Sequence, residues 1–226
     1  DTRGRLDEQL TSTDRDATSV TIGTSRAVGV AVDGPNPASL VAYDVARELG
    51  ADPDPATALA GAVAVETPPD GGPAAKAYEA AIDRGLERRP GLAIPVEDPV
   101  DGLAHSTRFH APFSGDEDAV DAEFEAVRND QTDGDDSRRA IASLVAITVT
   151  GDEASTRAAS ALHHGLHPHV TGGPYRTIGG HADVLDALAA RAPGLAVADA
   201  LGSDVRESAL ETWRAHARAA HRAVRN

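Results

Sequence analysis

Apolar residues recur along this chain mainly at the three- and four-residue spacing of amphipathic helices. The pattern predicts helices over residues 38–49, 56–65, 74–88, 116–127, 137–149, 153–164 and 203–224. Short β-branched or apolar runs predict strands at residues 19–23, 28–32, 92–94 and 195–197. Prolines are frequent between residues 90 and 99, and we place a domain boundary there, between residues 1–98 and 99–226.

The most distinctive short stretch is Gly179-Gly180-His181, which follows a β-leaning run and opens a helical pattern. Glycines at such a junction allow a positive φ and a close approach of the backbone to a ligand. The helix start offers free N–H groups and the positive end of its dipole, which favours a phosphate. The alternative is a plain strand-to-helix turn in which His181 caps or packs, because short glycine motifs have many false positives.

The last predicted helix carries two stripes at helical spacing. Leu210, Trp213, Ala217, Ala220 and Val224 form an apolar stripe that predicts burial. Arg214, Arg218, Arg222 and Arg225 form a basic stripe, the best candidate in the chain for a surface that faces phosphates. The alternative is that these charges only complement the helix dipole, since acidic residues precede the arginines and the arginines follow toward the negative C-terminal end.

Four histidines lie at the end of the predicted helix 153–164 and just after it, at positions 163, 164, 167 and 169. His163 and His167 have a spacing that puts both on one helix face, as zinc sites require. No third ligand follows at a fixed spacing, and Pro168 breaks the helix. A solvated helix end, where a protonated histidine complements the dipole, is the favoured alternative.

Four segments together resemble the DHH phosphoesterases, and RecJ-like proteins of extremely halophilic archaea in particular. Gly179-Gly180-His181 resembles the GGH motif of the DHH-associated domain. Residues 36–50 and 58–64 resemble the N-P-A-S and A-G-A helices that follow the family's DHH triplet. Residues 105–113 resemble an H-(S/T)-T-R-x-H-A-P-F stretch of that family.

The resemblance implies an α/β protein. It would contain the C-terminal part of a degenerate, partial parallel-sheet DHH-like domain in residues 1–98. A smaller α/β DHH-associated domain, which binds nucleic acid or substrate, would follow in residues 99–226. The residues expected to bind substrate are Gly179, Gly180, His181, Arg176, Arg214, Arg218 and Arg222.

The resembling family hydrolyses phosphodiesters with two Mn²⁺ or Mg²⁺ ions. Its D-x-D loop and DHH triplet are both missing from this sequence. Val65 or Glu66 stands where the family has its later aspartate. Asp33 and Glu66 are possible remnants, but two carboxylates without the histidines do not make a two-metal site. We therefore predict no catalytic or metal-binding residue in this chain.

Composition changes the picture in three respects. The chain has no cysteine and no methionine, which excludes disulfides and thiolate zinc sites and suggests a fragment or a trimmed product. Its net charge is −15 with a single lysine, Lys76, and the acidic residues are dispersed. That pattern favours a protein adapted to a high-salt cytoplasm over one with an acidic interaction face. No apolar run is long enough to predict a membrane span.

Three functions remain open at this point. The first is a RecJ-like single-strand exonuclease or phosphoesterase, of which this chain is the back half and binds single-stranded nucleic acid. The second is an inactive RecJ homologue that acts as a scaffold among replication or repair proteins. The third is a phosphodiesterase of the wider DHH group that acts on small molecules or oligonucleotides.

Overall fold

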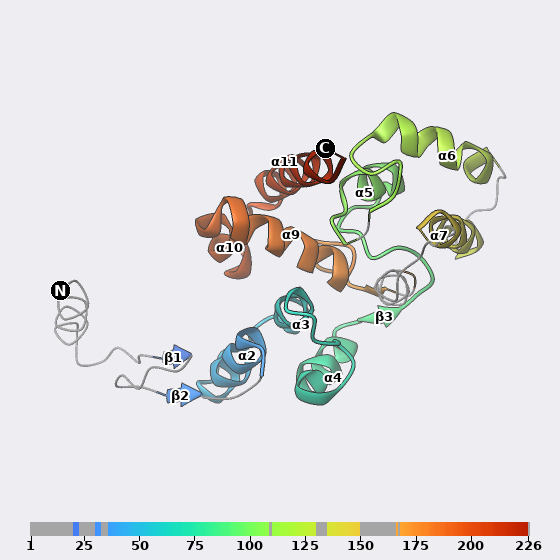
Figure 1. Cartoon of the computed structure of the whole chain (residues 1–226). Coiled ribbons are helices and arrows are strands. Elements are labelled where there is room, and N and C mark those ends of the chain that lie inside the picture. The colour runs from blue at the N-terminus through green and yellow to red at the C-terminus, as the bar shows by residue number, and fades with distance from the viewer. Residues whose placement is uncertain are drawn as a thin grey trace, which may run out of the picture.

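The computed structural model describes residues 20–22, 30–32, 36–108, 110–129, 135–149, 166 and 168–225. Most of these residues are helical (Figure 1). The helices are α2 (Ala38–Glu48), α3 (Pro55–Ala64), α4 (Ala75–Asp83), α5 (Pro99–His105), α6 (Glu117–Asn129), α7 (Asp135–Val149), α9 (Ile178–Arg191), α10 (Pro193–Ala200) and α11 (Arg206–Arg225). A short 3-10 helix precedes α4 at Gly72–Ala74.

The predicted α/β fold with a partial parallel sheet is wrong. The strands β1 (Val20–Ile22) and β2 (Val30–Val32) form one parallel pair, and β3 (Glu87–Arg88) and β4 (His169–Val170) form one antiparallel pair. In the described parts of the chain, no sheet has more than these two strands. The run 92–94 forms no strand, and 195–197 lies in α10, where Pro193 occupies the first helical position.

Two helices begin with the same device. Asp54 caps α3, because its carboxylate accepts from the N–H groups of Ala56 (3.2 Å) and Thr57 (2.9 Å). Asp98 caps α5 in the same way through Val100 N–H (2.9 Å). A proline fills the next position in both, where the missing N–H costs nothing.

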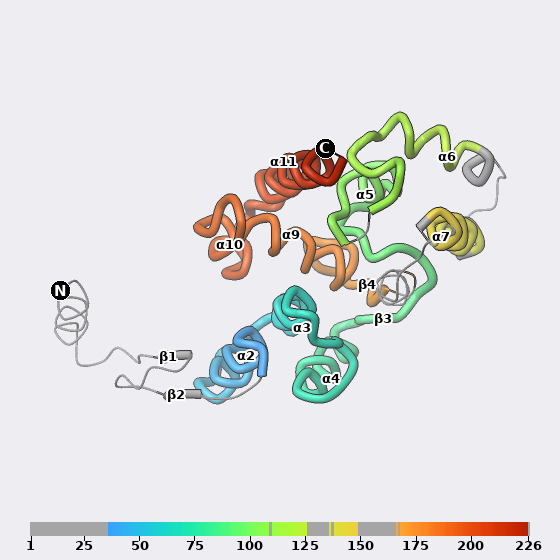
Figure 2. The backbone as a smooth tube through the Cα atoms, viewed as in Figure 1, coloured from blue at the N-terminus to red at the C-terminus, as the bar shows by residue number. Residues whose placement is uncertain are grey.

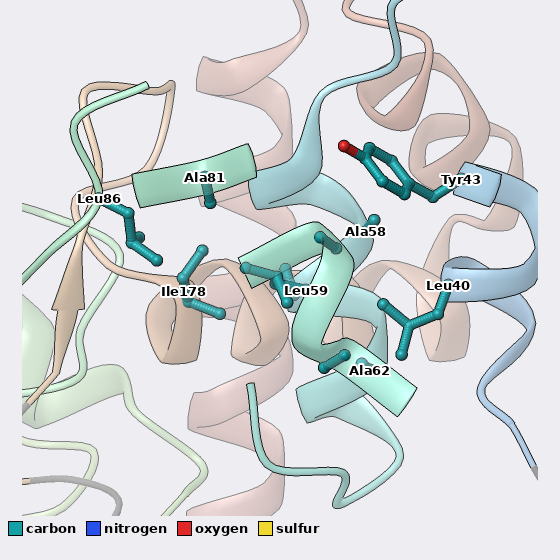
Figure 3. Close-up of a cluster of buried hydrophobic side chains, with 11 residues drawn as sticks. Leu40, Tyr43, Ala58, Leu59, Ala62, Ala81, Leu86 and Ile178 are labelled. Atoms are coloured by element: carbon teal, nitrogen blue, oxygen red, sulfur yellow. The ribbon is translucent and has the colours of Figure 1, made fainter. Parts of the chain in front are cut away.

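Helix α9 lies at the centre of the packing, between α3 on one side and α11 on the other (Figure 1). Ile178, in its first turn, joins the apolar cluster of α2, α3 and α4, where it points toward Leu59 and Leu86 (Figure 3). Its later residues Val184 and Leu188 join a second cluster with Trp213 of α11. Apolar contacts therefore cross the domain boundary predicted near residue 98, and the division itself stays a prediction.

A third apolar cluster joins α5, α6 and α7 through side chains such as Leu103, Phe124 and Val145. The tube in Figure 2 shows β4 beside β3, and from β4 the chain continues into α9. None of the described helices combines the length and apolar composition that a membrane span requires.

Candidate functional site

The predicted glycine turn lies in the first turn of α9. Thr177 caps this helix: its Oγ1 accepts from Gly180 N–H (2.9 Å) and donates to the carbonyl oxygen of Ile94 (2.8 Å). Neither Gly179 nor Gly180 has a positive φ. The conformational reason that the sequence suggested for these glycines is therefore wrong.

The two glycines are required by space. A β-carbon on Gly180 would lie 2.1 Å from the carbonyl carbon of Ile94 and 2.2 Å from the nitrogen of Pro95. A β-carbon on Gly179 would lie 2.9 Å from the β-carbon of Ala93. The close backbone approach at this turn is thus between α9 and the chain's own segment 93–95.

His181 is directed into the protein and is only 4% exposed. Its Nε2 lies 3.2 Å from Oδ2 of Asp199, and the Tyr175 hydroxyl donates to Oδ1 of the same carboxylate (2.7 Å). The Tyr175 and His181 rings lie 4.5 Å apart. Burial would raise the pKa of Asp199, but the hydrogen bonds from His181 and Tyr175 outweigh it and hold that pKa below its usual range. This geometry matches the alternative in which His181 packs.

Arg176 stands just before the turn and is partly exposed. Its guanidinium forms an ion pair with Glu97, and the backbone N–H of Arg176 donates to the carbonyl of Pro95 (3.1 Å). The positive charge that the sequence suggested for phosphate contact at this position is therefore matched by a carboxylate.

The basic stripe of α11 divides into an inner and an outer part. Arg214 donates from Nε (2.9 Å) and Nη2 (2.7 Å) to the two oxygens of Asp101 on α5. Arg218 donates from Nη1 to Nε2 of His105 (3.1 Å). Arg222 and Arg225 are exposed, and among the described residues neither forms an ion pair with a carboxylate. Only part of the predicted stripe is thus free to meet a partner.

Asp101 and His105 connect the inner arginines. His105 is 2% exposed, and its Nδ1 lies 3.0 Å from Oδ1 of Asp101. Burial would raise the pKa of Asp101, but the hydrogen bonds from Arg214 and His105 outweigh it and keep that pKa well below its usual range. The carboxylate is therefore ionised at neutral pH.

The same cluster also contains three potential ligands for a metal ion. Asp101, His105 and Glu117 bring one potential ligand atom each within 4.8 Å of one another. Arg214 occupies both oxygens of Asp101 and Arg218 occupies Nε2 of His105, so a cation would face two guanidinium groups.

The Mn²⁺ or Mg²⁺ pair of the resembling family does not fit the described residues. Glu66 is exposed at the end of α3 with a φ of 61°. Asp33 lies outside the described residues, as do His163 and His167, so the predictions made for those positions have no structural counterpart. His169 is described: it is buried, and its Nε2 lies 3.3 Å from the Tyr78 hydroxyl.

Residues 105–108, at the start of the resembling segment 105–113, connect the helices α5, α9 and α11. Thr107 donates from its N–H (3.1 Å) and its hydroxyl to the carboxylate of Asp183 on α9. The indole N–H of Trp213 donates to the same carboxylate (3.0 Å). Asp183 is fully buried, and sequence reasoning missed it. The available signal was a charged residue between the apolar positions Ala182 and Val184.

The same segment ends at a histidine pair. His221 of α11 donates from Nε2 to the carbonyl of Ser106 (3.0 Å). Its Nδ1 lies 3.3 Å from Nδ1 of the exposed His110. The segment 105–110 therefore contacts α11 at two levels, through Arg218 and through His221.

Comparison with known proteins gives sequence similarity without a described activity. No family model matches the sequence. An uncharacterized protein of Haloarcula marismortui is 49% identical over 191 residues, which cover 83% of this chain and 49% of that protein. The chain thus spans about half the length of this relative.

Proposed function

We propose that this chain is the nucleic-acid-binding part of a RecJ-like protein and that it contacts the phosphates of a single strand through the second half of α11. The observation that carries the proposal is charge segregation. From Thr212 to Arg225 the helix holds four arginines and no acidic residue, in a chain of net charge −15. Phosphate contacts of this kind position a strand without reading its bases.

The helix dipole explains only part of this pattern. Arg222 and Arg225 lie in the last turn of α11, where a positive charge is favourable for any helix. Arg214 and Arg218 lie earlier, and they are held by residues of α5 instead. The helix dipole thus accounts for the positions of Arg222 and Arg225, but not for the contacts that Arg214 and Arg218 make with α5.

We assign binding and not hydrolysis to these residues. The D-x-D loop and the DHH triplet are missing from the sequence, and the described carboxylates do not assemble a two-metal site. The Haloarcula relative and the dispersed acidic composition support a role in a high-salt cytoplasm.

The test is fluorescence anisotropy with a labelled oligodeoxythymidylate over a series of KCl concentrations. We expect wild type to bind, and Arg222→Gln with Arg225→Gln to weaken binding and reduce the salt slope by roughly 1.4, since each single-strand phosphate contact adds about 0.7. The control is Arg84→Gln with Arg139→Gln, which removes an equal charge from two exposed arginines outside α11. Equal affinities of the double variant and wild type would contradict the proposed phosphate contact. Metal-dependent cleavage of the strand would contradict the assignment of binding without hydrolysis.

A further inference from the structure

Arg218 differs from the other exposed arginines of α11 because a buried network holds its guanidinium. Arg214 fixes the Asp101 carboxylate through two hydrogen bonds of 2.9 and 2.7 Å. Asp101 in turn accepts from Nδ1 of His105 (3.0 Å), and Nε2 of His105 meets Nη1 of Arg218 (3.1 Å). The network begins at a partly buried arginine and ends at an exposed one.

The chemistry of the groups fixes the protonation state of His105. A guanidinium has only donors, so Nε2 of His105 must accept from Arg218. The ring proton then lies on Nδ1, where it is donated to Asp101. Among the described residues, Arg218 uses one of its five N–H groups, at His105, which leaves the others for a ligand.

Such a fixed guanidinium matters most in concentrated salt. At about 1 M salt the Debye length is roughly 3 Å, so attraction between a mobile surface arginine and a strand is largely screened. Short hydrogen bonds from a guanidinium to a phosphate persist, provided that the side chain is already ordered. Arg222, one turn further along α11, has no comparable partner among the described residues.

We propose that Arg218 is the preorganised phosphate contact of α11 and that His105 is the positioning residue that holds it. The ligand class is a phosphodiester of a single strand, so the inference rests on the proposed function. The alternative occupant of this cluster, a metal ion at Asp101, His105 and Glu117, is disfavoured by the two guanidinium groups that already contact its ligand atoms.

The experiment compares Arg218→Gln with Arg222→Gln, a matched loss of charge one turn away. Affinity for labelled oligodeoxythymidylate is measured from low to molar KCl. We expect the Arg218→Gln loss to persist at molar KCl at roughly tenfold, the size of a charged hydrogen bond. The Arg222→Gln loss should shrink to about twofold or less under the same conditions, as screening predicts.

Two substitutions of His105 then separate positioning from folding. His105→Gln places an amide oxygen near the Nε2 position and can still accept from Arg218, whereas His105→Asn reaches only the Nδ1 position. We expect the Gln variant to bind within about twofold of wild type and the Asn variant to lose as much as Arg218→Gln. In the Asn background, Arg218→Gln should add no further loss. Circular dichroism and a thermal melt establish that each variant is folded.

The outcomes distinguish the two proposals. Wild type that fails to bind at every KCl concentration overturns the proposed function and this inference with it. Wild type that binds, with equal losses for Arg218→Gln and Arg222→Gln at molar KCl, overturns the inference alone. If His105→Asn does not fold, the Gln variant decides: a folded His105→Gln protein that binds as poorly as Arg218→Gln overturns the role of His105.

Discussion

Gly180, in the first turn of α9, lies against the main chain of Ile94 at a distance that leaves no space for a side chain. The carbonyl carbon of Ile94 would be 2.1 Å from a β-carbon at position 180. This contact fixes where α9 enters the protein, and Thr177 reinforces it through a hydrogen bond to the Ile94 carbonyl (2.8 Å). The glycine pair is thus part of the packing on which the candidate site is built.

Gly180→Ala should therefore destabilise the protein severely. Overpacking usually costs about 1–3 kcal/mol, and we expect the upper end or beyond because the obstacle is backbone. Gly179→Ala should cost less, since it meets the Ala93 side chain (2.9 Å). The measurement is chemical denaturation in molar KCl. The control is Gly194→Ala in α10, where a β-carbon meets nothing within 4 Å and the change should be neutral or stabilising. A Gly180→Ala protein as stable as wild type would contradict this prediction, because it would mean that the backbone of segment 93–95 can shift to make room for a β-carbon at little cost.

The buried Asp183 carboxylate gives a second prediction. It accepts hydrogen bonds from the backbone and hydroxyl of Thr107 and from the indole of Trp213. Asp183→Asn turns one acceptor oxygen into a donor group and leaves a buried donor of Thr107 or Trp213 unmatched. We expect a loss of about 3 kcal/mol in the free energy of unfolding. Trp213 is the only tryptophan, so its fluorescence reports the local change directly. Glu79→Gln, an exposed carboxylate on α4, serves as the control and should unfold like wild type.

Helical periodicity allowed five of the helices to be predicted from sequence nearly to their ends, among them α2 and α11. The same reasoning missed α5, although Asp98-Pro99 repeats the Asp54-Pro55 signal that opens α3. It also misjudged residues 195–197, because a short apolar run does not distinguish a strand from a helix. Local pattern therefore predicted the long helices well, and it failed at the short helix α5 and at a run of three apolar residues.

The candidate site was predictable only in part, because its charges are paired over long distances. The spacing of the α11 arginines was visible in the sequence, but Asp101 precedes its partner Arg214 by 113 positions. No local rule connects them, so the sequence could not indicate which arginines are already engaged. The glycine pair presents a related difficulty: a positive φ and a close packing contact both demand glycine. Only the placement of segment 93–95 distinguishes the two causes.

Acid should weaken the Asp101 cluster in a defined pH range. The native pKa of Asp101 lies below its unfolded value, since its hydrogen bonds with Arg214 and His105 outweigh the effect of burial. Its contribution to stability is therefore complete above about pH 4 and is lost as the pH falls further. We expect Asp101→Asn to cost about 2 kcal/mol near neutral pH, and less as the pH falls below about 4, because the unfolded state then takes up a proton that native Asp101 does not. Urea denaturation at fixed KCl measures both proteins; a difference that stays constant with pH would contradict the assignment.

His221 should make stability depend on pH at a higher range. Burial lowers its pKa, the carbonyl of Ser106 opposes that effect, and the nearby His110 and Arg225 lower the pKa further. The native ring is therefore neutral at pH values where an unfolded histidine already binds a proton. The unfolded state takes up more protons below about pH 6.5, so stability must fall as the pH decreases through that value.

The variant His221→Gln isolates this effect because the glutamine amide can still donate to the Ser106 carbonyl, yet it does not titrate. We expect the variant to be less stable than wild type at pH 7 and the difference to shrink by roughly 1 kcal/mol by about pH 5, since one proton changes stability by at most about 1.4 kcal/mol per pH unit. Some dependence should remain in the variant, because burial also lowers the pKa of His169. The control is Thr212→Ala on the same helix, which removes no titratable group and should keep the wild-type dependence on pH. Parallel curves for His221→Gln and wild type would mean that the His221 ring titrates alike in the folded and unfolded states, and would contradict this prediction.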